Sequence, residues 1–211
     1  MSGPRAATQA ASPRVATPAD APVVTRILVA AFDDDPMWGP WAFPEPGRRW
    51  QQRETLFRLL VEGAMRYAWV WLAAEDLATA VWIPPGGSEL TSDQEQQVDS
   101  VLRDSLGDRA DAVLQAFEMF AEARPVEPHY YLTLFGTDPR HVGLGVGQRL
   151  LVDNLRQVDA QGEAAYLEAR DELVPLYERF GFRLRRRFQL SNGPTVNTMW
   201  RDPRPASPVG A

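Results

Sequence analysis

A loop with three alternating glycines is the part of this sequence best suited to chemistry. Residues 137–151 read TDPRHVGLGVGQRLL, so Gly143, Gly145 and Gly147 follow an apolar run and lead into a helical pattern. Glycine has no Cβ, so the backbone can turn tightly and present successive N–H groups to a ligand. A helix beginning near Val146 adds its free first-turn N–H groups and the positive end of its dipole. The loop therefore predicts an anion site, and a phosphate is the anion that suits it.

Two familiar glycine loops do not fit this spacing. A Walker A loop needs a Lys after its glycines, and the sequence contains no Lys. The Rossmann fingerprint G-x-G-x-x-G opens the first strand–helix unit of a domain, whereas Gln148 stands at its third glycine position and the loop lies late in the chain. The loop belongs to neither class.

A second motif follows the strand-like segment Ala165–Ala169, where residues 175–182 read PLYERFGF. In this order and spacing, the loop and the motif resemble the GNAT acetyltransferase superfamily. Its acyl-CoA loop reads Q/R-x-x-G-x-G/A, and its second motif reads x-[FL]-Y-[EK]-x-x-G-F. The resemblance covers roughly residues 13–202, and the layout is most similar to puromycin N-acetyltransferase and its small-molecule relatives.

The resemblance implies a fold and a donor. The fold is an α/β, mixed-sheet GNAT acyl-CoA N-acyltransferase fold, with a central, mostly antiparallel sheet flanked by helices, and acetyl-CoA is the co-substrate. In the family the pantetheine arm lies like an extra strand between two splayed strands, and a backbone N–H near Phe135 would donate to the thioester oxygen. The implied donor-binding residues are Phe135, Gly136 and Thr137 for pantetheine, and Val142, Gly143, Leu144, Gly145, Val146, Gly147 and Gln148 for the pyrophosphate.

Two side chains are candidates for catalysis. Acyl transfer from a thioester to an amine needs a neutral amine, a polarised carbonyl and a proton for the leaving thiolate. The family places the tyrosine of its second motif beside the sulfur, so Tyr177 is the expected general acid; the alternative is that it only packs the helix on the sheet. Glu168 is a candidate base or water-positioning group, unless it pairs with Arg170 or caps the neighbouring loop. Because there is no Cys nucleophile, we expect direct transfer in a ternary complex.

The acceptor site is expected around a Pro- and Trp-rich loop. Asp33, Asp34 and Asp35 precede it, and carboxylates beside aromatic rings suit a cationic substrate. A solvated acidic turn and a Trp-rich core explain the same residues. The expected substrate-binding residues are Trp38, Trp41, Trp82 and Tyr131, and His129 is a further side chain that can line the same cleft.

Three departures from the family pattern leave alternatives for the function open. Val142 stands at the Q/R position, Leu144 stands where relatives often carry Arg or Lys, and Leu173 replaces the usual Asn of the second motif. The first hypothesis is an N-acetyltransferase that acts on a primary amine of a small molecule. The alternatives are a degenerate GNAT-fold module that binds a ligand or partner without catalysis, and an N-acetyltransferase of proteins or peptides.

Hydrophobic periodicity predicts the elements that position these residues. The expected order is strand, helix, helix, two strands, two helices, strand, helix, strand, helix, two strands. Trp50, Phe57 and Leu60 recur at helical spacing, and the apolar segment His129–Phe135 is expected to be a central buried strand. Ser191-Asn192-Gly193 is expected to turn a final hairpin.

Composition narrows the class of protein. The chain has 211 residues, 45% of them hydrophobic, with a net charge of −6. We expect a single domain over residues 14–202 between disordered tails at residues 1–13 and 203–211. The acidic balance argues against nucleic acid as a partner, and the absence of Cys with only two His argues against a metal site. Without a signal peptide or a long apolar stretch, we expect a cytoplasmic protein with no membrane contact.

Overall fold

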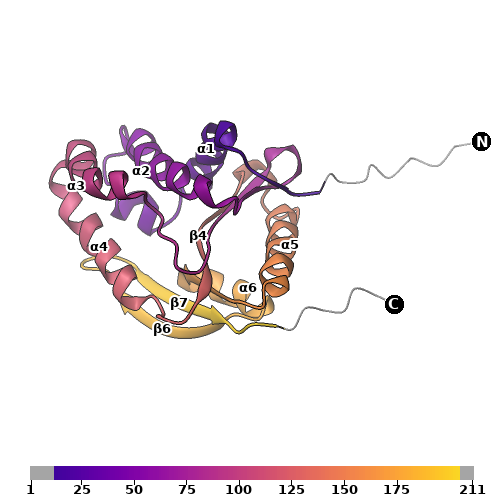
Figure 1. The fold of residues 1–211 in the computed structure, drawn as a ribbon. Helices are drawn as coiled ribbons and strands as arrows, with labels where there is room; N and C mark the ends of the chain where they lie inside the picture. The colour runs from indigo at the N-terminus through magenta and orange to yellow at the C-terminus, as the bar shows by residue number, and fades with distance from the viewer. Residues whose placement is uncertain (1–11, 205–211) are drawn as a thin grey trace, which may run out of the picture.

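A computed structural model describes residues 12–204 (Figure 1). The predicted order of elements is confirmed. The predicted disordered tails fall almost entirely outside the described residues. The helices are α1 (Ala21–Ala31), α2 (Arg49–Ala64), α3 (Ser92–Leu106), α4 (Ala110–Ala123), α5 (Val146–Ala160) and α6 (Val174–Arg179). The strands are β1 (Arg14–Val15), β2 (Val70–Leu72), β3 (Ala78–Ile83), β4 (His129–Thr137), β5 (Ala164–Ala169), β6 (Arg183–Gln189) and β7 (Thr195–Arg201).

The strands form one seven-stranded sheet in the order β1-β2-β3-β4-β5-β7-β6. Every neighbouring pair is antiparallel except β4 and β5, which are parallel. The mixed α/β fold with a mostly antiparallel sheet is therefore confirmed. β4 is the middle strand, which accounts for its apolar side chains on both faces.

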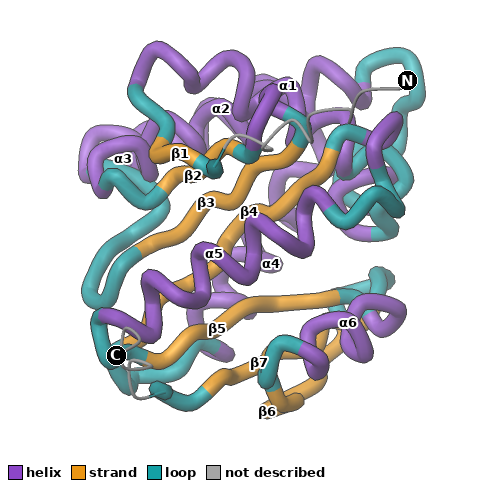
Figure 2. The backbone as a smooth tube through the Cα atoms, turned by 90° about the vertical axis from the view of Figure 1, so that its right-hand side faces the viewer, coloured by secondary structure: helices purple, strands orange, loops and turns teal. Residues whose placement is uncertain are grey.

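Helices cover both faces of the sheet and enclose two cores. The larger core contains Val24 and Leu28 of α1 together with residues from α2, α3 and α4. The second core lies on the opposite face, where Leu150 and Leu155 of α5 and Tyr177 of α6 pack on the strands. Figure 2 shows α5 and α6 on the near face and α4 behind the sheet. The two faces thus have separate sets of helices.

Local sequence explains where several of these elements begin. Thr17 and Asp20 form a capping box ahead of α1, and Thr91 caps α3 by accepting the backbone N–H of Gln94 at 3.2 Å. One detail of the sequence pattern is wrong. Trp50, expected on the apolar face of the second helix, is 49% exposed at the start of α2, because the buried stripe begins two residues later with Gln52 and Arg53.

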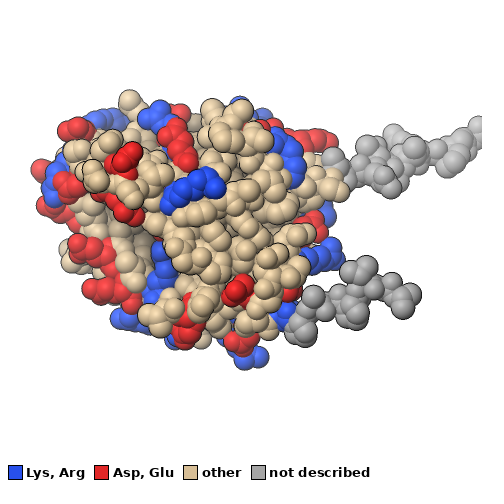
Figure 3. All heavy atoms as spheres, viewed as in Figure 1, with Lys and Arg blue, Asp and Glu red and all other residues tan. Residues whose placement is uncertain are grey.

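Helices α3 and α4 form an insertion between β3 and β4 at one side of the molecule. Acidic side chains gather there, at the left of Figure 3, and include the exposed Asp99, Asp104, Asp108 and Asp111. This side therefore contributes to the net charge of −6. No helix within residues 12–204 is long and apolar enough to cross a bilayer.

Candidate active site

The sheet opens between its two parallel strands. β4 and β5 pair only from His129 with Ala164 to Leu132 with Leu167, and the strands then diverge (Figure 2). Beyond this point β4 remains paired with β3 on its other side as far as Thr137. Within residues 12–204, the edge of β4 from Thr133 to Thr137 therefore faces a gap rather than a strand. Its backbone donors and acceptors are available to an extended ligand.

A bulge in β4 turns side chains toward the gap. Val81 of β3 pairs with Leu134, and the next residue, Trp82, pairs with Leu132, so Thr133 is an extra residue in β4. A bulge bends a strand and re-aims its side chains. Tyr131 and Leu134 consequently lie in the same core, although three residues apart in a regular strand they would point to opposite faces.

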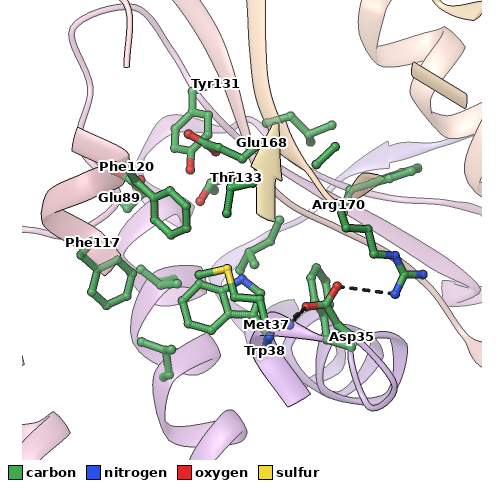
Figure 4. A pocket seen from close by; sticks show the side chains of 18 of the residues that line it. Asp35, Met37, Trp38, Glu89, Phe117, Phe120, Tyr131, Thr133, Glu168 and Arg170 are labelled. Atoms are coloured by element: carbon green, nitrogen blue, oxygen red, sulfur yellow. Dashed lines mark hydrogen bonds and ion pairs between the residues drawn. The ribbon is translucent and has the colours of Figure 1, made fainter. Parts of the chain in front are cut away.

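A cavity of about 470 Å³ lies at this opening, between the sheet and the insertion of α3 and α4. Figure 4 shows Tyr131, Thr133 and Glu168 on one side of the cavity and the side chains of Phe117, Met37 and Trp38 away from them. Five residues that the sequence predicts for the site line this cavity: Trp38, Tyr131, Phe135, Glu168 and Tyr177.

Glu168 is the carboxyl group in the cavity whose pKa is raised most strongly. Its Oε1 atom is buried and has no hydrogen-bond partner among the described residues. Burial raises the pKa of Glu168 from 4.5 to about 7, although the charge of Arg124 and the phenols of Tyr131 and Tyr166 act in the opposite direction. A carboxyl group with a pKa near neutrality can take a proton from a substrate at physiological pH.

Tyr177 lines the cavity from α6 and is 6% exposed. Its ring also meets the ring of Phe182 edge-on, with centroids 5.9 Å apart, so the packing expected from the sequence is present as well. Burial raises the pKa of the Tyr177 hydroxyl above its ordinary value, with Arg170 acting in the opposite direction. The phenol is therefore protonated at neutral pH, which is the state that a proton donor needs.

Arg124 and Glu89 belong to the cavity and were missed by sequence reasoning. Arg124, which follows α4, donates to both carboxylate oxygens of Glu89 at 2.6 and 3.2 Å. Its guanidinium carbon lies 4.1 Å from the centroid of the Tyr131 ring. No motif marks either residue, because the pair joins two loops that are distant in sequence.

Asp35 is a second group whose setting the sequence did not reveal. Its carboxylate accepts the backbone N–H groups of Met37 at 2.9 Å and Trp38 at 2.8 Å, and one oxygen lies 3.8 Å from a guanidinium nitrogen of Arg170. Burial raises the pKa of Asp35 against these partners. Asp35 therefore fixes the start of the Trp38 turn. Arg170, which the sequence offered as a partner for Glu168, pairs with Asp35 and Glu172 instead.

The glycine loop lies at the start of α5. Gly143 and Gly145 have φ of 86° and 74°, a left-handed conformation that other residues rarely adopt. In the loop, the Leu144 amide donates to the His141 carbonyl at 3.4 Å, and the next backbone bond is that of the Arg149 amide to the Gly145 carbonyl at 3.0 Å. The first-turn N–H groups between them remain available. A Cβ on Gly147 would overlap Thr137 Oγ1. The helix thus begins against the end of β4, beside the opening.

Two predicted acceptor residues, Trp82 and Trp41, do not line the cavity, so those predictions are wrong. Trp82 points to the opposite face of β3, where its Nε1 donates to Asn154 of α5 at 3.0 Å in the second core. Trp41 donates to the Ser191 carbonyl at 3.4 Å and lies under the guanidinium of Arg109. His129 lies outside the cavity too, between the rings of Tyr166 and Trp200.

The family profile described as an acetyltransferase (GNAT) domain matches residues 115–201, a segment that holds the split strands, the glycine loop and Tyr177. Residues 115–201 therefore contain a GNAT acetyltransferase domain. Such a domain is typical of acetyl-CoA-dependent N-acyltransferases. GNAT enzymes use acetyl-CoA as a co-substrate, and residues 12–204 hold no cluster of three or more acidic or His side chains suited to a metal ion.

Individual relatives differ in how much of the chain they match. N-alpha-acetyltransferase RimI of Mycobacterium tuberculosis is 39% identical over 79 residues, which cover 35% of this chain and 49% of that protein. The match thus spans about half the length of this curated relative. A histone acetyltransferase HPA2 and related acetyltransferase from Corynebacterium glutamicum is 28% identical in structure-based alignment, with 96% and 100% of the two chains covered and a TM-score of 0.71.

A polyamine N-acetyltransferase of Drosophila melanogaster, which forms N-acetylagmatine, shares the fold. It is 16% identical, with a TM-score of 0.64 over 90% of this chain and 98% of the other. At this level of identity the likeness concerns the fold alone.

The GNAT loop of this chain departs from the superfamily pattern at two exposed positions. Val142 and Leu144 are 67% and 63% exposed, so neither is needed for packing. The two arginines near the loop form hydrogen bonds within the protein: Arg140 donates to Asp138 at 2.6 Å, and Arg149 donates to the Leu144 carbonyl at 3.1 Å. Phosphate binding here would depend mainly on backbone N–H groups.

Proposed function

We propose that this chain is an N-acetyltransferase that transfers an acetyl group from acetyl-CoA to a primary amine of a small molecule, directly within a ternary complex. The observation that carries the proposal is Glu168, a carboxyl group with an unpartnered oxygen and a pKa of about 7. It lies where β4 and β5 separate. A group in this state suits the removal of a proton from an amine.

Acetyl-CoA is assigned to the gap and the glycine loop. The pantetheine arm would extend along the free edge of β4, at Phe135, Gly136 and Thr137. A backbone N–H near Phe135 would donate to the thioester oxygen and stabilise its developing negative charge. The loop from Val142 to Gln148 would hold the pyrophosphate, since amides at a helix N-terminus favour an anion. The left-handed glycines of the loop support this assignment.

Glu168 and Tyr177 take complementary roles in this scheme. Glu168 accepts a proton from the ammonium form of the acceptor, directly or through a water molecule, and leaves a neutral amine. The amine nitrogen attacks the thioester carbon, and the carbon–sulfur bond then breaks. Tyr177 gives its proton to the departing thiolate, and the proton that the nitrogen loses as the amide forms returns to the Tyr177 oxygen. Trp38 and Tyr131 are assigned to the acceptor site because they line the same cavity.

A second candidate is acetylation of the amino terminus of a protein. The partial match with RimI favours it, while the cavity of about 470 Å³ suits a small acceptor better. A peptide would have to place its amino terminus beside Glu168 and lie across the rim of α4.

The proposal is tested by calorimetry with acetyl-CoA, followed by a thiol-release assay with small amines and with short peptides. We expect micromolar binding of acetyl-CoA and release of CoA with small amines. Release with peptides alone would favour the second candidate. No binding at millimolar acetyl-CoA would refute both and would point to a module without catalysis.

A further inference from the structure

We infer that the acceptor is a monoamine with a flat, apolar body, and that amines with a second positive charge are disfavoured. This inference rests on the proposed function and names the acceptor class of that same cavity. Two independent features of the cavity carry it: the pairing of its charged groups and the composition of its helical wall.

The charges of the cavity leave room for one cation. Four carboxylates line it, at Asp35, Glu89, Glu118 and Glu168. Asp35 is paired with Arg170 and with two backbone N–H groups, and Glu89 is paired with Arg124 through two hydrogen bonds. These two carboxylates are already neutralised.

The remaining two carboxylates differ in their exposure to solvent. Glu118 is exposed on α4, where water screens its charge. In the cavity interior, Glu168 has one carboxylate oxygen without a hydrogen-bond partner among the described residues. A first ammonium group can therefore pair with Glu168, whereas a second cation would be desolvated beside Arg124 and Arg170 without a free counter-charge.

The wall away from Glu168 is aromatic. The Trp38 ring lies 5.9 Å from the Phe117 ring and 6.5 Å from the Phe120 ring, centroid to centroid. Trp38 and Phe117 are only half-buried and line the cavity together with Leu114. Figure 4 shows Trp38 and Phe117 away from Glu168. Rigid aromatic faces favour a flat apolar group, so the amine would lie at Glu168 and the body of the acceptor on this wall.

A matched pair of amines tests the inference. Agmatine and 4-phenylbutylamine both carry a primary amine on a four-carbon chain, and they differ at the other end, which is a guanidinium or a phenyl group. We expect kcat/KM for 4-phenylbutylamine to exceed that for agmatine by at least about tenfold, the order of discrimination that one apolar contact provides. An equal or higher value for agmatine overturns the inference and leaves the proposed acetyltransferase function standing.

Direct binding separates failure of the inference from failure of the function. Calorimetry with each amine, with CoA present, measures the same preference without turnover. If neither amine is acetylated but 4-phenylbutylamine binds at least about tenfold more tightly, the proposed function fails and the ligand class stands. Tighter binding of agmatine overturns the ligand class.

Substitution of Phe117 tests the aromatic wall. Phe117→Glu places an unpaired carboxylate on the aromatic wall and is expected to move the ratio of kcat/KM values toward agmatine by at least about tenfold. Phe117→Ala, a smaller change, is expected to weaken 4-phenylbutylamine selectively. Phe188→Ala is the matched control, because Phe188 packs against Phe120 at 5.9 Å but does not line the cavity. Unchanged ratios in both Phe117 variants would contradict the assignment of the wall.

Discussion

Replacing Glu168 by Gln is expected to stabilise the protein at alkaline pH while removing its activity. In the folded protein, burial raises the pKa of Glu168 from 4.5 to about 7. The carboxylate form is therefore held in an environment that disfavours its charge. Gln has nearly the same shape as protonated Glu and cannot ionise, so the variant avoids this cost.

The size and sign of the effect follow from proton linkage. Between pH 4.5 and about 7 the folded state binds the proton of Glu168 and the unfolded state has released it, so the free energy of unfolding falls as pH rises through this window. At about 1.4 kcal/mol per pH unit, the window corresponds to about 3 kcal/mol. This stabilisation is fully present below pH 4.5 and is lost above about pH 7.

Urea unfolding followed by tryptophan fluorescence at several pH values measures the effect. The free energy of unfolding of Glu168→Gln, relative to the unmodified protein, is expected to rise by about 3 kcal/mol between pH 4.5 and pH 8. Glu118→Gln, a change at an exposed carboxylate on α4, serves as the control and should show no such trend. A difference for Glu168→Gln that is constant across this range would refute the reasoning. In the active protein, kcat/KM should fall about tenfold per pH unit below pH 7.

Four further changes probe the rest of the site and the fold. Tyr177→Phe should lower kcat by about 100-fold or more with acetyl-CoA affinity preserved in calorimetry; unchanged turnover would remove Tyr177 from the acid role. Gly145→Glu should abolish acetyl-CoA binding, because it strains a left-handed position and places negative charge in the anion site. The control Gly162→Glu, at another left-handed glycine, should retain binding. Arg124→Met removes a charge that lowers the pKa of Glu168, so the acid limb of the kcat/KM profile should move to higher pH; an unmoved limb would show that Arg124 is only structural. Asp159→Ala removes hydrogen bonds of 2.6 and 2.7 Å from the buried Arg201. It should lower the free energy of unfolding, measured by urea denaturation, by about 3 kcal/mol. A loss under about 1 kcal/mol would argue that solvent already reaches this pair.

Local motifs predicted the parts of the structure whose geometry is set by neighbours in sequence. The alternating glycines specify a turn that only glycine tolerates, and Gly143 and Gly145 adopt it. The order of strands and helices also followed from periodicity and turn residues, because each element forms over a short stretch of chain. These features needed no knowledge of distant contacts.

The cavity depended on distant contacts and was predicted only in part. Trp82 was assigned to the cleft, but alternation along β3 directs it to the α5 side of the sheet. The bulge at Thr133 brings Tyr131 and Leu134 to one face, and no sequence pattern marks it. The raised pKa of Glu168 arises from burial beneath the insertion, which composition and spacing do not reveal.

The short junction between β4 and β5 has a consequence for the lifetime of the protein. Only the pairs from His129–Ala164 to Leu132–Leu167 join the two parts of the sheet. An extended donor bound in the gap would add backbone hydrogen bonds where the strands separate. A ligand that binds only the folded state at 100 times its Kd raises the free energy of unfolding by about 2.7 kcal/mol. On the proposed function, resistance to proteolysis would follow the cellular supply of acetyl-CoA, so the amount of enzyme would adjust to its own co-substrate.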